Sequence, residues 1–175
     1  MIIVFTGNGK GKTTAALGQA MRAVGRGKKV LVIQFIKGPW KSGEDYVALR
    51  GKGKDGKGKF LIKKMGKGFV GILGDTLPRK VHQRAAEAAL AHFRKSISKY
   101  DVLILDEVNV ALSLRLIRAS DVVRAIKSAP KGKMIILTGR GAPKSILAAA
   151  QLVTEMREIK HPFQKGRKGE IAIEF

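Results

Sequence analysis

The chain has 175 residues, 45% of them apolar, and is therefore long enough to bury a core of its own. It has no cysteine, which excludes disulfides, thiolate metal sites and cysteine nucleophiles, and no apolar stretch approaches the roughly 20 residues that span a bilayer, so we expect a cytoplasmic protein without membrane insertion. Its 35 Lys and Arg against 13 Asp and Glu give a net charge of +22, which favours polyanionic ligands such as nucleic acid, an anionic membrane surface or ATP.

The first expected elements are a strand, a glycine-rich turn and a helix. An apolar strand is predicted at residues 2–5, and an alanine-rich helix from residue 14 to about residue 24. Residues 6–14 between them read Thr-Gly-Asn-Gly-Lys-Gly-Lys-Thr-Thr. In a turn placed this way, backbone N–H groups and the helix N-terminus surround an anion. We therefore predict a nucleotide-phosphate site; the alternative is a plain glycine-rich turn between a strand and a helix.

The side chains of this turn have separate expected roles. Lys12 is expected against the outer phosphates, and the Thr13 hydroxyl is placed to ligate Mg²⁺. The usual spacing has glycine at the position of Thr6, so this turn is a variant of the phosphate-loop pattern. The residues of the turn expected to bind nucleotide are Gly7, Asn8, Gly9, Lys10, Gly11, Lys12, Thr13 and Thr14.

Strand and helix signals continue to alternate after the first helix. Residues 29–36 form a continuous apolar run, typical of a parallel strand buried on both faces. Lys37, which follows it, is expected either to contact the nucleotide or to be simply exposed. The Gly/Lys segment at about 50–59 has no apolar face and is expected to be an exposed, mobile loop. Nucleic-acid binding by that segment is the less favoured alternative, because it contains no aromatic side chain that could stack on bases.

The next predicted elements are a short strand at residues 60–62, a glycine-rich loop, a helix from Pro78 to about Ser98, and a buried strand at residues 101–107. That strand ends in Asp106 and Glu107, at the edge where ligands of open α/β sheets bind.

Carboxylates in this place are what a phosphate-bound Mg²⁺ needs, although many strands end in carboxylates without any metal. We predict a metal site formed by Thr13, Asp106 and Glu107, and catalytic roles for Lys12, Thr13 and Glu107.

The last third of the chain is expected to form two short helices, a strand and one more helix. The helices are predicted at residues 108–117 and 120–128, with Ser120 as N-cap, and the strand at residues 133–138. Arg140, in the turn that follows, is expected either to approach phosphate or ribose or to be a solvated arginine. A helix then begins at Pro143, and residues 152–175 are expected to form short strands and turns.

The three histidines, His82, His92 and His161, lack the spacing of metal ligands and are expected to be core or surface residues.

These elements predict the fold class. We expect residues 1–175 to form a single α/β domain with a recombinase-like P-loop fold, in which helices flank a mostly parallel central sheet.

Five segments, in the same order along the chain, resemble the P-loop family of ATP:corrinoid adenosyltransferases, which adenosylate cob(I)alamin and cob(I)yrinic acid a,c-diamide. The similarity extends from residue 2 to about residue 174, and the segments are residues 6–14, 34–38, 105–107, 138–141 and 154–161.

The resemblance implies an enzyme that transfers the 5′-deoxyadenosyl group of ATP to the Co(I) centre of a corrinoid and releases triphosphate, in adenosylcobalamin synthesis or salvage. It implies ATP as co-substrate, Mg²⁺, a corrinoid substrate and an electron donor that supplies Co(I); family members are often homodimers. Co(I) is already a strong nucleophile, so the reaction needs no general base, and the sequence offers no evident nucleophile–base pair.

Two features differ from the family pattern. The family's Gly-Phe-x-Trp segment matches residues 68–71, which keep Phe69, the expected corrinoid-binding residue, and have Gly71 in place of tryptophan. The only tryptophan, Trp40, lies elsewhere, and the sequence begins at the first strand, without the family's N-terminal helical extension.

Two other functions remain as alternatives: a small P-loop ATPase acting with nucleic acid, which the charge and Glu107 favour, and a nucleotide-binding scaffold without catalysis.

Overall fold

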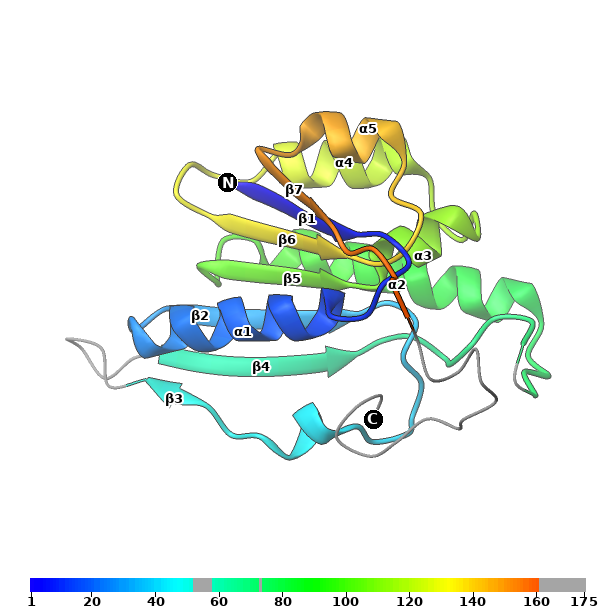
Figure 1. Cartoon of the computed structure of the whole chain (residues 1–175), viewed down its shortest axis with the longest axis horizontal. Coiled ribbons are helices and arrows are strands. Elements are labelled where there is room, and N and C mark those ends of the chain that lie inside the picture. The colour runs from blue at the N-terminus through cyan, green and yellow to red at the C-terminus, as the bar shows by residue number, and fades with distance from the viewer. Residues whose placement is uncertain (52–57, 73, 161–175) are drawn as a thin grey trace.

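A computed structural model describes residues 1–51, 58–72 and 74–160 (Figure 1). These residues form a seven-stranded sheet with the strand order β3-β4-β2-β5-β6-β1-β7. All neighbouring strands are parallel except β3 and β4, which are antiparallel. The strands are β1 (Ile2–Thr6), β2 (Lys29–Gln34), β3 (Arg50–Gly51), β4 (Gly58–Lys64), β5 (Val102–Asp106), β6 (Met134–Thr138) and β7 (Leu152–Glu155).

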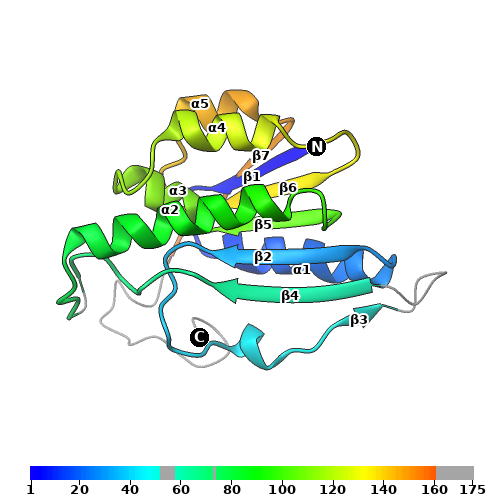
Figure 2. The same ribbon diagram turned by 180° about the vertical axis from the view of Figure 1, so that it is seen from behind.

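Helices cover both faces of the sheet, as Figures 1 and 2 show from opposite sides. The helix α1 lies on one face, and α2, α4 and α5 lie on the other. The helices are α1 (Lys12–Gly25), the 3₁₀ helix η1 (Gly43–Tyr46), α2 (Arg79–Ser96), α3 (Val108–Ser113), α4 (Ala119–Lys127) and α5 (Lys144–Ala149). The predicted α/β class with a mostly parallel, helix-flanked sheet is therefore confirmed. None of the helices in the described part of the chain is long and apolar enough to cross a bilayer.

The core has two layers, one on each side of the sheet, because successive strand residues point to opposite faces. On the α1 side, alanines of α1 pack against one set of strand residues, including Val32 and Ile104. On the other side, α2, α4 and α5 cover the alternate set, including Leu31 and Leu105. Both faces of the central strands are buried, which explains why their sequences are continuous apolar runs.

The parallel arrangement brings the carboxyl ends of β1, β2, β5 and β6 to one edge of the sheet. The residues that end these strands are Thr6, Gln34, Asp106 and Thr138. The glycine-rich turn of residues 7–11 also leaves the sheet at this edge, since it follows β1. Ligands of open α/β sheets bind at this edge, so the fold gathers the predicted site residues where such a site is expected.

Part of the prediction for the Gly/Lys segment is wrong. Arg50–Gly51 form β3, and Gly58 and Lys59 begin β4, although residues 50–59 were expected to form a loop; residues 52–57 lie outside the described residues. The short strand predicted at residues 60–62 is confirmed as the middle of β4. The strand β4 pairs with β2 from Lys59 to Lys64. This backbone pairing outweighs the weak strand propensity of glycine and lysine.

Other boundaries also differ from the predictions. The helix expected to reach residue 117 ends at Ser113, and Arg115 beyond it has the left-handed φ of 54°, which a helix cannot continue through. The helix α4 is capped by Arg118, so the expected N-cap, Ser120, lies inside its first turn. Pro78 and Pro143 precede their helices as N-caps. Most of the expected tail, residues 161–175, lies outside the described residues, so the single-domain organisation of residues 1–175 stays a prediction.

Candidate functional site

The glycine-rich turn forms a tight loop between β1 and α1. Gly7 and Gly11 have φ values of 94° and 110°, which side chains other than glycine's rarely allow. The Gly9 amide donates a hydrogen bond to the Met156 carbonyl at 2.7 Å, and a Cβ at Gly9 would lie 2.7 Å from the Arg157 carbonyl carbon. The loop is therefore pressed against the segment after β7, and its glycines are required by both conformation and space.

Lys12, the first residue of α1, lies inside this turn. Its side chain is only 7% exposed, and Nζ donates a hydrogen bond to the Gly9 carbonyl at 2.6 Å. Burial lowers the pKa of Lys12, while the nearby carboxylate of Glu107 opposes that shift. A buried ammonium at a helix N-terminus is suited to bind phosphate oxygens.

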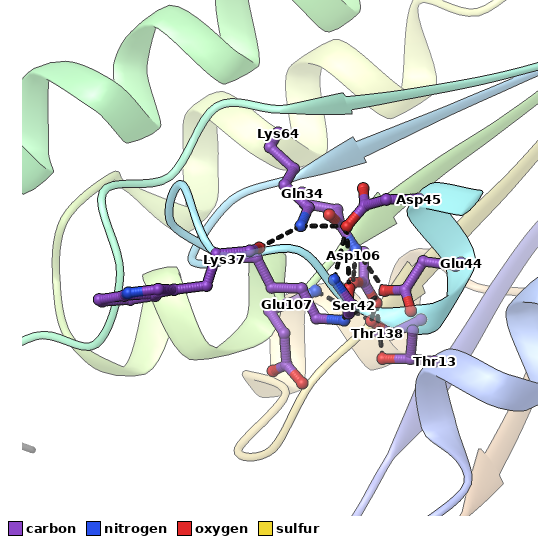
Figure 3. Close-up of polar contacts among 11 residues, drawn as sticks. Thr13, Gln34, Lys37, Ser42, Glu44, Asp45, Lys64, Asp106, Glu107 and Thr138 are labelled. Atoms are coloured by element: carbon purple, nitrogen blue, oxygen red, sulfur yellow. Dashed lines mark hydrogen bonds and ion pairs between the residues drawn. The ribbon is translucent and has the colours of Figure 1, made fainter. Parts of the chain in front are cut away.

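Asp106 is fully buried at the end of β5 and connects four elements of the edge (Figure 3). Its Oδ1 accepts hydrogen bonds from Thr13 Oγ1 at 2.8 Å and Thr138 Oγ1 at 2.7 Å. Its Oδ2 accepts one from Gln34 Nε2 at 3.2 Å. The structure thus brings together the predicted pair Thr13 and Asp106. It also adds Gln34 and Thr138, which the sequence analysis did not assign to the site.

Glu107 follows Asp106 but points away from the Thr13–Asp106–Thr138 cluster (Figure 3). It is the N-cap of α3, with a left-handed φ of 59°, and its backbone N–H donates to Thr138 Oγ1 at 2.9 Å. Burial, with a smaller contribution from Asp106, raises the pKa of Glu107 to about 7, although Lys12 and Arg140 act against the shift. Glu107 is therefore a carboxyl that exchanges its proton near neutral pH, held by a strained backbone.

The segment after β2 forms a second polar cluster beside Asp106 (Figure 3). Gln34 Nε2 also donates to Glu44 Oε1, at 3.2 Å, and Glu44 forms an ion pair with Lys37. Although burial opposes ionisation of Glu44, the hydrogen bond from Lys37 lowers its pKa. Lys64 of β4 forms an ion pair with Asp45, which also accepts a hydrogen bond from the Ser42 amide at 2.7 Å. The predicted nucleotide contact of Lys37 thus has a competing partner, Glu44, in this structure.

The remaining predicted residues lie around this edge. Arg140 is exposed in the turn after β6, close enough to act on the pKa values of Glu107 and Lys12. Phe69 is 45% exposed in the segment after β4. Asn8, Lys10 and Thr14 are exposed on the glycine-rich turn and the start of α1. The ligand contacts expected of these residues stay predictions.

The histidines that the structure describes fit the prediction of core or surface roles. His82 is 3% exposed and lies 3.0 Å from Asp75 Oδ2, and His92 is half-buried, with burial lowering its pKa. His161 lies outside the described residues. Among residues 1–51, 58–72 and 74–160, no group of three or more His, Cys, Asp or Glu side chains could hold a metal ion.

Three residues of the site were not assigned from the sequence, and the signals that could have found them differ in strength. These residues are Gln34, Glu44 and Thr138. Thr138 precedes the turn containing Arg140, and Gln34 ends an apolar strand, so each stands at a strand end on the ligand edge. That placement was a usable signal. Glu44 had no such signal, because it lies in a long polar stretch and reaches the site only through η1.

Comparisons with known proteins agree on one family. The family model described as ATP:corrinoid adenosyltransferase BtuR/CobO/CobP matches residues 1–175. The corrinoid adenosyltransferase of Escherichia coli strain K12 is 40% identical over 181 residues, covering 100% of this chain and 85% of that protein. The corrinoid adenosyltransferase CobA of Salmonella typhimurium strain LT2 is 38% identical with the same coverage.

A relative from Pseudomonas aeruginosa strain PAO1, also named corrinoid adenosyltransferase, is 36% identical over 177 residues, covering 100% of this chain and 83% of that protein. Among solved structures, the ATPase DotB of Legionella pneumophila matches with a TM-score of 0.41 and 12% identity, covering 86% of this chain and 34% of that one. That structural similarity is too weak to bear on fold or function.

Proposed function

The chain belongs to the ATP:corrinoid adenosyltransferase family, and we propose that it transfers the 5′-deoxyadenosyl group of ATP to the Co(I) centre of a corrinoid. The C5′–O bond of ATP breaks, both electrons of the new cobalt–carbon bond come from Co(I), and triphosphate leaves. The product serves cobalamin synthesis or salvage. The observation that carries the proposal is the buried Lys12 inside the glycine-rich turn, one residue before a threonine bonded to Asp106.

The reaction needs alignment and charge stabilisation more than proton transfer. Co(I) is a strong nucleophile, so the protein's task is to hold cobalt in line with C5′ and to stabilise the departing triphosphate. Lys12 and the amides at the start of α1 are suited to that stabilisation, because a buried ammonium group lies at the positive end of a helix there. The other residues that we propose for nucleotide binding are Gly7, Asn8, Gly9, Lys10, Gly11, Thr13, Thr14, Lys37 and Arg140.

The residues around Thr13 fit Mg²⁺. The Thr13 hydroxyl and an Asp106 carboxylate oxygen are hard oxygen donors 2.8 Å apart, and Mg²⁺ is usually bound through one or two carboxylates together with substrate phosphates. We propose that Thr13 and Asp106 hold the ion, whereas Glu107 points away from them in this structure and its role as a metal ligand stays a prediction. When bound, Mg²⁺ would neutralise part of the negative charge that develops on the triphosphate.

Further proposals concern the partners. An electron donor must supply Co(I), and a corrinoid substrate must approach C5′ from the side opposite the leaving triphosphate. Phe69 is the residue that we propose for contact with the corrinoid. We also propose a cytoplasmic location, as the composition of the sequence led us to expect, and a homodimer, as the resemblance implies.

A second candidate function is ATP hydrolysis in association with nucleic acid. Its support is the net charge of +22 together with Glu107, whose pKa of about 7 would let it accept a proton from an attacking water. This function differs from adenosyl transfer in its phosphate product, so one assay separates the two.

The assay incubates the protein with Mg-ATP and a chemically reduced corrinoid under anaerobic conditions, followed by phosphate analysis and absorbance spectroscopy. We expect triphosphate and a cobalt–carbon bond in equal amounts. ADP and phosphate, formed faster in the presence of DNA or RNA, would instead support the ATPase. The absence of any turnover would support a nucleotide-binding scaffold.

A further inference from the structure

Gln34 is a buried amide between two carboxylates at the ligand edge of the sheet (Figure 3). It ends β2, where its Cα is in register with that of Asp106 on β5, and its side chain is fully buried. Its Nε2 donates to Asp106 Oδ2 and to Glu44 Oε1, both at 3.2 Å. Ionised carboxylates only accept hydrogen bonds, so the amide nitrogen has to face them. Gln34 therefore connects the loop after β2 with the end of β5.

This orientation of the amide leaves its oxygen without a partner. Oε1 of Gln34 is buried and accepts no hydrogen bond from the residues that the structure describes. A buried acceptor without a partner destabilises a fold, and its presence in a native structure needs an explanation. An apolar side chain of similar volume would fill the same space without that cost. The two contacts of Nε2 with carboxylates supply the explanation that packing does not.

The contact with Gln34 fixes the direction of the Asp106 carboxylate. Oδ1 of Asp106 accepts hydrogen bonds from Thr13 at 2.8 Å and Thr138 at 2.7 Å. Within the described part of the chain, Oδ2 accepts its hydrogen bond from Gln34 alone. Because both oxygens are held, the carboxylate cannot rotate, and Oδ1 stays beside the Thr13 hydroxyl. These are the two oxygens that we propose for Mg²⁺, so Gln34 would orient a metal ligand.

The contact with Glu44 extends the connection to Lys37. Oε1 of Glu44, the atom that accepts from Gln34, also accepts from Lys37 Nζ. The Glu44 side chain is 14% exposed, and Lys37 Nζ also donates to Ser42 Oγ at 3.2 Å. The ammonium group of Lys37 is therefore linked to Asp106 through two side chains. This places a cation of the loop after β2 close to the metal ligands that we propose.

The 3₁₀ helix η1 keeps Glu44 in this place. Asp45, the next residue of η1, accepts a hydrogen bond from the Ser42 amide at 2.7 Å and forms an ion pair with Lys64. Lys64 ends β4, in register with Gln34 of β2. The helix η1 is thus tied to the same sheet edge that holds the amide, and Glu44 is pre-organised for its two donors.

We propose that Gln34 and Glu44 are positioning residues of the nucleotide site. Gln34 holds Asp106 with Oδ1 towards Thr13, and Glu44 holds the Lys37 ammonium beside this pair until nucleotide phosphates replace the carboxylate as its partner. Carboxylate and phosphate are both oxyanions that accept charge-assisted hydrogen bonds, so Lys37 can exchange one for the other. The proposal rests on the proposed function and adds these two residues to it.

The first test concerns Gln34. Gln34→Leu removes both hydrogen bonds at similar volume, Gln34→Met does so with an unbranched side chain in case the leucine variant does not fold, and Gln83→Leu, at a half-buried glutamine of α2, is the control. Isothermal titration calorimetry measures ATP binding in EDTA and at increasing Mg²⁺ concentrations, without corrinoid. We expect the Gln34 variants to raise the Mg²⁺ concentration for half-maximal ATP binding about tenfold, with an unchanged Kd in EDTA.

Two results of this titration would overturn the role of Gln34. One is an ATP affinity that falls equally with and without Mg²⁺, which would show that the residue is structural only. The other is a magnesium requirement equal to that of the wild type and of Gln83→Leu, whether or not Tm falls.

The second test concerns Glu44. Glu44→Leu removes the acceptor, Glu44→Gln keeps an oxygen in its place, and Glu87→Leu, at an exposed glutamate of α2, is the control. We expect Lys37→Ala to weaken Mg-ATP binding about tenfold and Glu44→Leu several-fold, with most of that loss recovered in Glu44→Gln. The double variant should bind no more weakly than Lys37→Ala alone, because Glu44 acts through Lys37. Additive losses, or unchanged or tighter binding by Glu44→Leu, would contradict its positioning role.

Trp40 reports the exchange of partners directly. It is the only tryptophan of the chain and lies between Lys37 and Glu44 in the loop after β2. We expect Mg-ATP to change the fluorescence of Trp40 in the wild type, and Lys37→Ala to abolish this change. An equal change in both proteins would show that Lys37 does not move from Glu44 to the nucleotide.

These measurements use no corrinoid, so they separate the positioning roles from the proposed reaction. If the variants behave as expected but the wild type yields no triphosphate with reduced corrinoid, the reaction fails and the positioning roles stand. If the wild type makes the adenosylated product and the variants keep its magnesium requirement and ATP affinity, the positioning roles fail and the reaction stands. ATP binding by the wild type that is independent of Mg²⁺ would overturn the metal site and the role of Gln34 together.

Discussion

The two sides of the candidate site are built in opposite ways. The nucleotide side is centred on one continuous segment, residues 6–14, which includes the buried Lys12. The aromatic hollow, a space of about 190 Å³ lined by Trp40, Phe69, Ile72 and Leu77 together with the exposed Lys67 and Thr76, is assembled from two loops that are distant in sequence. The difference fits the ligands that we propose: polyphosphate is bound by charge and amides at close range, whereas a flat macrocycle needs a wide, weakly polar surface.

The comparison predicts that substitutions on the nucleotide side lower turnover, whereas those in the hollow weaken corrinoid binding. The largest effect is expected for Lys12→Ala. Loss of one electrostatic donor to a leaving group commonly costs about 3 kcal/mol in the barrier, so we expect kcat to fall about 100-fold or more. Triphosphate release under single-turnover conditions measures it, with Lys28→Ala, an exposed lysine beyond the other end of α1, as control. An intact kcat would move the chemistry away from the turn.

Asp106→Asn should have the next largest effect. The substitution removes the charge that Thr13 and Thr138 face, and we expect kcat to fall about 10- to 100-fold with a higher Mg²⁺ concentration for half-maximal activity. Magnesium titrations of the variant and of Asp121→Asn, a surface control on α4, measure this effect. An unchanged magnesium requirement in the Asp106 variant would argue against its role as a metal ligand.

Glu107→Gln is expected to change the pH dependence of stability. In the folded wild type the pKa of Glu107 is raised from 4.5 to about 7, so the folded state holds more protons than the unfolded state between these values. The contribution of protonated Glu107 to the free energy of unfolding is therefore complete below pH 4.5 and is lost as the pH rises through 7. Urea unfolding at pH 5 and pH 8 measures this effect. Between the lower and the higher pH, the free energy of unfolding of the variant should rise by about 2 kcal/mol relative to that of the wild type. If the free energies of unfolding of the variant and the wild type changed in parallel with pH, the result would contradict the raised pKa of Glu107.

The smallest effect is expected for the simultaneous replacement of Lys52, Lys54 and Lys57 by serine. Their role is predicted from sequence alone, as solvated charges with no part in either side of the site. We expect kcat/KM for ATP and for the corrinoid to change less than about twofold at physiological salt, since exposed charges are screened. A large fall for one substrate only would assign the Gly/Lys segment to that side of the site.

The sequence was informative about the nucleotide side because that side is local. A strand, a glycine turn and a helix are contiguous, and their order alone predicts that amides and Lys12 converge. The contact between Thr13 and Asp106 was also predictable. Thr13 follows the turn that leaves β1 at the carboxyl edge of the sheet, and Asp106 ends a parallel strand at the same edge.

The aromatic hollow could not be predicted in the same way. Trp40 and Gly68 are 28 positions apart, and only the pairing of β2 with β4 brings their loops together. The contacts of Asp75, which lines the hollow, depend on amides of its own loop and on a histidine of α2, which sequence spacing does not reveal. The strand predicted at residues 60–62 is confirmed as part of β4. Its extension to Gly58 and Lys64 depends on pairing with β2 and β3, because glycine and lysine favour other structures.

The most direct measurement is a crystal structure of the protein with Mg-ATP and a corrinoid. The account predicts a triphosphate within hydrogen-bond distance of the residue 7–14 amides and Lys12, with C5′ directed towards a macrocycle in contact with Phe69. A nucleotide bound away from this turn, or a corrinoid bound without contact to Phe69, would contradict it.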